Sequence, residues 1–147
     1  MTTMRILIAA ALVAGLSACA STPMASKEAD AAAKEFKTPA ADAARVYIYR
    51  NENFGAAVKL PVAIDNAMAG DTVAHSYIMK DLPAGKHTIT GKGENDSSVT
   101  LDTVAGKIYY VWQEVKMGLF APRNQLQEVD EKTGQDGVKE SSLIAPL

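Results

Sequence analysis

The stretch Arg45-Val-Tyr-Ile-Tyr-Arg50 decides the fold, because it is dense in β-branched and aromatic residues and apolar on both of its faces. This composition is typical of a strand in the interior of a sheet. Residues 107–116 have the same character, with Tyr109, Tyr110 and Trp112 among them. We therefore expect two interior strands, and residues 107–116 to form the central one.

Shorter β-rich segments surround these two, and turn residues separate them. Residues 58–64 alternate between apolar and polar, and Pro61 predicts a sheet edge or a bulge there because proline cannot donate a backbone hydrogen bond. The remaining expected strands are residues 72–80, the hairpin of residues 86–92 and 97–103, and residues 124–130. About seven short strands without a long amphipathic helix predict a mainly β fold, an antiparallel β-sandwich of the immunoglobulin or PEGA-like kind over residues 45–130.

The N-terminal residues 1–18 have the order of a secretory signal peptide. Arg5 supplies a positive charge, and the apolar run that follows is shorter than the roughly twenty residues of a membrane-spanning helix. The run ends in Leu16, Ser17, Ala18 and Cys19, a stretch that closely resembles the lipobox of bacterial lipoproteins. The alternatives are a plain secretory peptide with an incidental cysteine, or a free cysteine buried in a retained helix.

The resemblance to the lipobox implies a role for Cys19, the one cysteine of the chain. It implies cleavage behind Ala18, a diacylglyceryl thioether on the Cys19 sulfur and an acylated new N-terminus. Two or more acyl chains anchor a protein stably to a membrane. By resemblance to bacterial sorting rules, Ala20 rather than aspartate in the next position implies the periplasmic face of the outer membrane. The expected partner is thus a membrane, reached through the acyl chains.

Residues 19–44 are rich in alanine and charged residues and predict a partly helical tether. Asp30 and Lys34 stand at i,i+4 and favour a helix, but an isolated helix this short is marginal in water. As a coil the segment would span about 25–30 Å, and as a helix about 37 Å. In the alternative, Phe36 docks this helix onto the β-domain.

Five motifs follow one another along residues 45–130. They are Arg45-Val-Tyr-Ile-Tyr-Arg50, Val62-Ala-Ile-Asp65, Ser76-Tyr77, Leu82-Pro-Ala-Gly-Lys-His-Thr-Ile89 and Ala105-Gly-Lys-Ile-Tyr-Tyr-Val111. In this order they resemble the domain of unknown function family 2846. The resemblance implies a small β-domain, often on a lipoprotein, with no assigned activity.

Residue types that carry catalysis are sparse. His75 and His87 are the only histidines, and no Gly-x-Ser-x-Gly motif occurs. His75 and Ser76 would point to opposite faces of a strand, and His87 is expected to be a hydrogen-bonded framework residue. No metal-ligand spacing occurs, and we expect a solvated hairpin tip at residues 94–96 rather than a calcium site. We therefore expect no catalytic residue, no metal and no cofactor.

Two features could mark recognition of a partner. The aromatic residues of the two interior strands would form a patch if one sheet face were uncovered, although core filling is the favoured interpretation. Met117, Leu119 and Phe120 belong to an apolar loop that could bind a partner if exposed, or join the core if folded back as a lid. Residues 131–147 predict a polar tail or a short helix. The formal net charge is −2 with interspersed signs, which excludes a basic face for nucleic acid.

Together these expectations describe a lipid-anchored β-domain of the cell envelope that is not an enzyme and acts as a binding or assembly module. An accessory subunit of an envelope transport or secretion complex, docked through residues 117–122, is the alternative. A cell-wall hydrolase is a third possibility, and it requires His75 or His87 beside a carboxylate in a cleft. Envelope proteins are possible partners besides the membrane.

Overall fold

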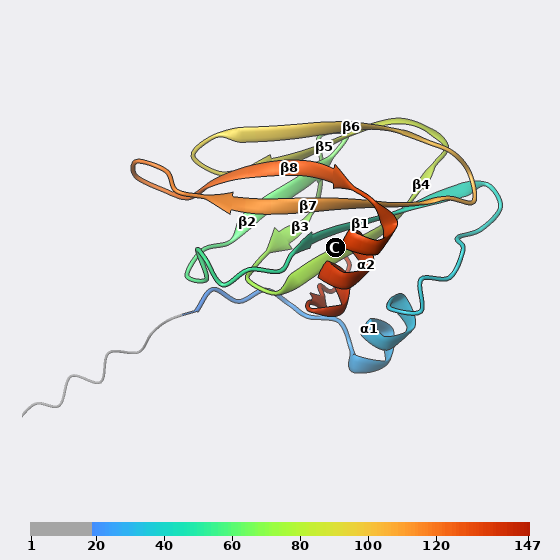
Figure 1. The fold of residues 1–147 in the computed structure, drawn as a ribbon, viewed down its shortest axis with the longest axis horizontal. Helices are drawn as coiled ribbons and strands as arrows, with labels where there is room; N and C mark the ends of the chain where they lie inside the picture. The colour runs from blue at the N-terminus through green and yellow to red at the C-terminus, as the bar shows by residue number, and fades with distance from the viewer. Residues whose placement is uncertain (1–18) are drawn as a thin grey trace, which may run out of the picture.

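The protein is a sandwich of two β-sheets with two short helices on one outer face (Figure 1). The computed structural model describes residues 19–147. The predicted signal peptide 1–18, with Leu16, Ser17 and Ala18 of the lipobox, lies outside the described residues. Most neighbouring strands are antiparallel, so the predicted mainly β sandwich is confirmed.

The first sheet has five strands, and β1 is the middle one. Their order across the sheet is β8 (Arg123–Val129), β7 (Ile108–Lys116), β1 (Ala43–Arg50), β4 (Ser76–Pro83) and β9 (Ser142–Leu143). Residues 107–116 were expected to be central, but β7 lies between β8 and β1. Strands β1 and β7 run parallel, as do β4 and β9, so the sheet is mixed rather than purely antiparallel.

The second sheet has four strands, in the order β3 (Ala67–Thr72), β2 (Leu60–Ile64), β5 (Gly85–Lys92) and β6 (Asp96–Thr103). The predicted hairpin is confirmed as β5 and β6. Pro61 predicted either a sheet edge or a bulge. Strand β2 is not at an edge, since it lies between β3 and β5, but it does have a bulge between Val62 and Ala63.

The expected single strand over residues 72–80 is wrong. The chain turns between Thr72 and Ser76, where His75 has a φ of 54°, and passes from the second sheet to the first. With this split and the added β9, the described residues hold nine strands where about seven were expected.

The main core lies between the two sheets and is made of aliphatic side chains. Its buried members are Val46, Ile48, Val62, Ile64, Ile78, Leu82, Ile89, Leu101, Val111, Leu126 and Ile144. Alternate residues of β1 point to the opposite face, where they meet a second core.

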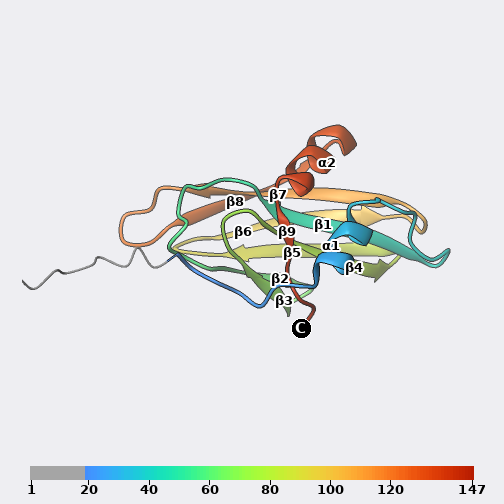
Figure 2. The same cartoon turned by 90° about the horizontal axis from the view of Figure 1, so that it is seen from below.

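The second core is aromatic and lies under the helices α1 (Lys27–Ala33) and α2 (Glu131–Lys139), on the outer face of the five-stranded sheet (Figure 2). Its buried members are Ala33, Tyr47, Tyr49, Tyr77, Tyr110, Val138 and Leu143. Both faces of β1 are therefore covered, which explains why its sequence is apolar on both sides. The aromatic residues of the interior strands fill a core there, as the favoured interpretation had it.

Residues 20–44 are packed against the domain, so the expectation of a free tether is corrected. The Ala20 N–H donates to the Ala56 carbonyl at 3.0 Å, and the Ala25 N–H donates to the Leu143 carbonyl at 2.9 Å. Phe36 contacts the Tyr47 ring edge-on, with the centroids 5.4 Å apart. Aromatic burial of this kind stabilises the segment more than helix propensity does, so the docked-helix alternative describes the structure.

The C-terminal residues are also more ordered than a polar tail. They form the short helix α2 and then β9, after which Ile144 bridges to Met24. Neither α1 nor α2, the helices of residues 19–147, has the length and apolar character needed to span a bilayer.

Candidate functional site

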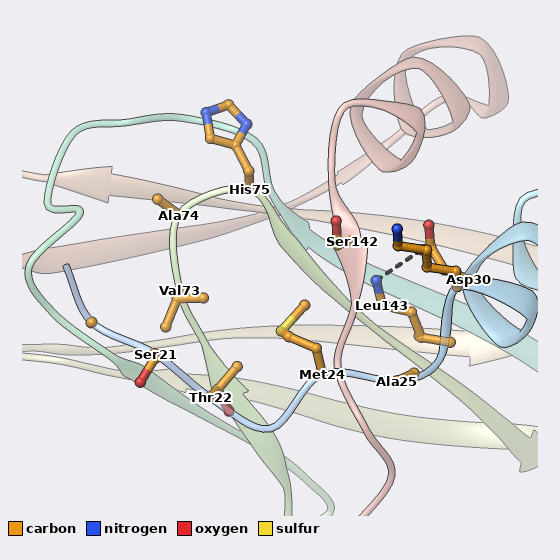
Figure 3. Close-up of a pocket in the computed structure, with 12 residues that line it drawn as sticks. Ser21, Thr22, Met24, Ala25, Asp30, Val73, Ala74, His75, Ser142 and Leu143 are labelled. Carbon is orange, nitrogen blue, oxygen red and sulfur yellow. Dashed lines mark hydrogen bonds between the residues drawn. The ribbon is translucent and has the colours of Figure 1, made fainter.

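An open pocket of about 450 Å³ lies between the N-terminal segment from Ala20 onward, the turn before β4, and β9 (Figure 3). The Cys19 thiol itself is exposed. The lining residues are Ala20, Ser21, Thr22, Met24, Ala25, Lys27, Asp30, Val73, Ala74, His75, Ser142 and Leu143. Half of these residues are apolar, and the titratable side chains among the others are those of Lys27, Asp30 and His75.

Asp30 is fully engaged by donors from three elements. Its Oδ1 accepts from the Leu143 N–H and from the Tyr77 hydroxyl, each at 2.8 Å, and its Oδ2 accepts from Lys34 Nζ at 2.8 Å. Burial acts to raise the pKa of Asp30, but the bonds from Lys34, Tyr77 and Leu143 together outweigh it and hold the pKa below its usual value. Asp30 is therefore a clamp that fastens α1 to β4 and β9, and it is ill suited to act as a base.

His75 is held at the rim of the pocket. Its Nε2 lies 2.9 Å from Asn53 Oδ1, and its Nδ1 lies 3.3 Å from the Glu140 carbonyl. Figure 3 shows its ring pointing away from Met24 and the pocket interior. Its two ring nitrogens meet an amide and a carbonyl rather than a carboxylate, so the arrangement lacks the orienting acid of a catalytic triad.

His87 lies in the other sheet and pairs with Asp65. Its Nδ1 is 2.6 Å from Asp65 Oδ2 and its Nε2 is 2.7 Å from the Pro83 carbonyl. Both partners are acceptors, so the ring is satisfied only when both nitrogens carry protons. The bonds to Asp65 and Pro83 raise the pKa of His87, and the bond from His87 lowers the pKa of Asp65. The predicted framework role of His87 is confirmed. Within residues 19–147, no cluster of histidine, cysteine and carboxylate side chains could hold a metal ion.

The apolar loop between β7 and β8 is exposed, which decides between the two expectations for it. Met117 and Leu119 are each 80% exposed and Phe120 is 97% exposed. We call residues 117–122 the apolar tip. Phe54, itself half exposed, and Gly55 line a second open pocket together with these residues.

The apolar tip has a fixed backbone because Glu94 binds it from the neighbouring hairpin. The Glu94 carboxylate accepts the N–H groups of Leu119, Phe120 and Ala121 at 3.1, 2.7 and 2.9 Å. Arg123 Nε adds a bond at 2.9 Å. The backbone bonds, with Phe120 first, lower the pKa of Glu94 to about 2. Residues 94–96 were expected to be a solvated hairpin tip, but Glu94 instead organises the apolar tip.

Arg50 was not expected from sequence to be buried, yet its side chain has no solvent exposure. Its guanidinium donates to carbonyls of the β1–β2 connection, at 3.0 Å to Val58 and at 3.3 Å to Phe54, and it also binds Gly55. Burial lowers the pKa of Arg50. The sequence feature that could have predicted the burial of Arg50 is its position at the end of a strand that is apolar on both faces.

These features define a class: a small two-sheet β-domain that is covered by helices on one face and carries an exposed cysteine and an apolar tip. Residues 40–125 match the family described as Protein of unknown function (DUF2846), and the chain belongs to that family. The resemblance expected from the five motifs is therefore confirmed.

The chain is similar to a protein of Haemophilus influenzae that is described as an uncharacterized protein. It is 33% identical over 129 residues, which cover 87% of this chain and 77% of the relative. This similarity extends over most of both chains. No solved structure matches the chain significantly.

Proposed function

We propose that the protein is a lipid-anchored β-domain at the periplasmic face of the bacterial outer membrane, where it acts as a non-enzymatic binding or assembly module. The observation that carries the proposal is the position of Cys19. It is exposed and stands at the end of a lipobox-like stretch, and the packed fold begins at the next residue, Ala20. Cleavage behind Ala18 leaves each of the described residues in place, and acylation of Cys19 disturbs no packed side chain.

The state of the ionisable side chains supports a role without catalysis. Asp30 and His87 are held in hydrogen bonds with other residues of the fold, and the His75 ring contacts an amide and a carbonyl. A cell-wall hydrolase would need one of these groups free to accept a proton near a nucleophile.

The alternative role, an accessory subunit of an envelope transport or secretion complex, draws support from the exposure of Leu119 and Phe120. Large apolar side chains that gather on a surface are typical of interaction sites. Both roles require the same anchor, so the anchor is tested first.

Cys19→Ala tests the anchor in cells that express the full chain with a palmitate analogue in the medium. We expect the wild-type chain to take up the label and to sediment with the outer membrane, and Cys19→Ala to lose both properties. Ser21→Ala is the matched control, since Ser21 is exposed and lies two residues downstream. A Cys19→Ala chain that is still cleaved behind Ala18 and retained in the membrane would overturn the proposal.

A further inference from the structure

We infer that the apolar tip is a second membrane contact, and that Leu119 and Phe120 enter the interfacial region of the bilayer to which Cys19 is anchored. The inference rests on the proposed lipidation of Cys19 and deepens it, because it assigns an orientation to the domain. The occupant is a phospholipid bilayer.

The first argument is that the apolar tip and Cys19 lie at the same end of the sandwich. In Figures 1 and 2, the chain enters the fold in blue at the end where the orange β7–β8 connection projects. Two observations link them: the Ala20 N–H binds the Ala56 carbonyl, and the adjacent Gly55 and Phe54 line an open pocket together with the tip. Since residues 20–44 are packed rather than extended, acyl chains on Cys19 bring this end to the lipid surface.

The second argument is that Glu94 already binds three of the backbone N–H groups in the tip, so these groups do not depend on water for hydrogen bonds. An unsatisfied backbone group is costly in lipid. Here the N–H groups of Leu119, Phe120 and Ala121 are already bound by Glu94, and Pro122 has none. The Glu94 charge is itself paired with Arg123. The side chains of Leu119 and Phe120 can therefore enter an apolar medium while these three backbone N–H groups keep their hydrogen bonds.

The third argument is that the apolar surface of the tip protrudes. Phe120 is 97% exposed and Leu119 80%, and a projecting pair of this kind suits the soft interface of a bilayer, where aromatic and aliphatic side chains are readily accommodated. A protein partner would need a hollow shaped to receive them. Because the tip lies at the same end of the sandwich as the proposed acyl chains, a bilayer is favoured over a protein partner.

A tryptophan at the tip tests the inference in the lipidated protein, purified from cells that express the full chain. The native Trp112 is replaced by Phe, a mild change because the indole N–H lacks a hydrogen-bond partner. Phe120→Trp then carries the probe, and Val104→Trp is the matched control. Val104 is also an exposed apolar residue, but it lies before β7 at the far end of that nine-residue strand, about 30 Å away. Both proteins are reconstituted in vesicles of phosphatidylcholine and phosphatidylglycerol, with the phosphatidylcholine plain or brominated in its acyl chains.

We expect brominated lipid to reduce the fluorescence of the Phe120→Trp protein about twofold or more and to leave the Val104→Trp protein unchanged, as fits a burial depth of several ångströms. Equal quenching of the two proteins, while mass spectrometry and flotation show an acylated and bound chain, would overturn the inference and leave the anchor intact. An unacylated chain would overturn the anchor and the inference with it. Photo-crosslinking from position 120 in cells adds a further outcome, since adducts to a protein rather than to lipid would also overturn the inference.

Discussion

Arg50 is the residue on which the Cys19 end of the sandwich depends. Its buried guanidinium holds the carbonyls of Phe54, Gly55 and Val58, and the same connection receives the Ala20 N–H at Ala56. No carboxylate in residues 19–147 forms an ion pair with this cation; backbone carbonyls instead bind both of its terminal nitrogens, while its Nε has no partner there. The charge thus serves to shape a loop rather than to bind a ligand.

Arg50→Met should therefore destabilise the protein substantially. The substitution removes the charge but leaves four backbone carbonyls, that of the buried Thr72 among them, without this donor, and we expect a loss of about 2–4 kcal/mol in the free energy of unfolding. Lys92→Met is the matched control, because Lys92 forms an exposed pair with Asp96 and should cost about 1 kcal/mol or less. Urea denaturation measures both. Equal losses for the two variants would contradict the structural role of Arg50.

His87 and Asp65 predict a stability that depends on pH in a defined window. The pKa of His87 is raised in the folded state, so its contribution is fully present below the ordinary pKa of histidine and is lost as the pH rises through the folded value. The pKa of Asp65 is lowered, so its contribution is present above the ordinary pKa of aspartate and is lost as the pH falls through the folded value. Between these limits the pair is fully charged.

His87→Gln should flatten the alkaline side of this window. Urea denaturation of the wild-type and variant proteins between pH 5 and pH 9, a range chosen to bracket histidine titration, measures the difference. His75→Gln is the control, since the His75 ring contacts Asn53 and the Glu140 carbonyl instead of a carboxylate. A wild-type profile with no fall as His87 titrates would show that the pair does not contribute.

At the scale of elements, α2 depends on two glycines that let it approach the tyrosines of the five-stranded sheet. A Cβ at Gly134 would overlap the Tyr110 ring, and a Cβ at Gly137 would overlap the Tyr49 ring. Neither glycine has a positive φ, so close approach rather than backbone conformation explains them.

Gly134→Ala is expected to be destabilising even though alanine favours helices by about 1 kcal/mol over glycine. The overlap with Tyr110 should outweigh that gain and leave a net loss of about 1–3 kcal/mol, which thermal or urea unfolding measures. Lys132→Ala, on the exposed side of the same helix, should leave the free energy of unfolding nearly unchanged. A stabilised Gly134→Ala protein would mean that α2 does not pack as closely as described.

The strands were largely predictable from sequence because their signals are local. Residues 86–103 alternate and turn within a short span, and the β5–β6 hairpin follows directly. The parallel pairing of β1 with β7, by contrast, places Arg45 opposite Ile108. It depends on the path of all the residues between these two strands. No local pattern encodes that choice.

The site was less predictable, since its key contacts are long-range and use polar side chains. Glu94 lies at the tip of a hairpin and accepts the Leu119 N–H. The polar sequence of that tip fits a solvated turn equally well, so it did not predict this contact. Asp30 binds Leu143 across 113 positions, and its local partner Lys34 had suggested only a helix in isolation. Alanine-rich composition therefore predicted a tether, although Phe36 carried the signal for docking.

At the scale of the whole molecule, this docking changes the distance between domain and membrane. A free segment of residues 19–44 would hold the sandwich about 25–37 Å from the lipid, whereas the packed segment leaves almost no spacer behind Cys19. Acylation at Cys19 would then fix which end of the sandwich meets the bilayer. Whether the N-terminal segment is packed or free thus determines whether the domain lies at the membrane surface or is held away from it.

Asp30→Ala tests the packing of this segment, because Asp30 joins α1 to β4 and β9. Loss of its bonds to Leu143, Tyr77 and Lys34 should cost the segment about 2–4 kcal/mol and release it by local unfolding, while the sandwich stays folded. Trypsin should then cleave behind Lys27 and Lys34 much faster than in the wild-type protein. Glu28→Ala is the matched control, since Glu28 is exposed in the first turn of the same helix. Equal cleavage rates in all three proteins would mean that aromatic packing alone holds the segment, and the spacing from the membrane would then not depend on Asp30.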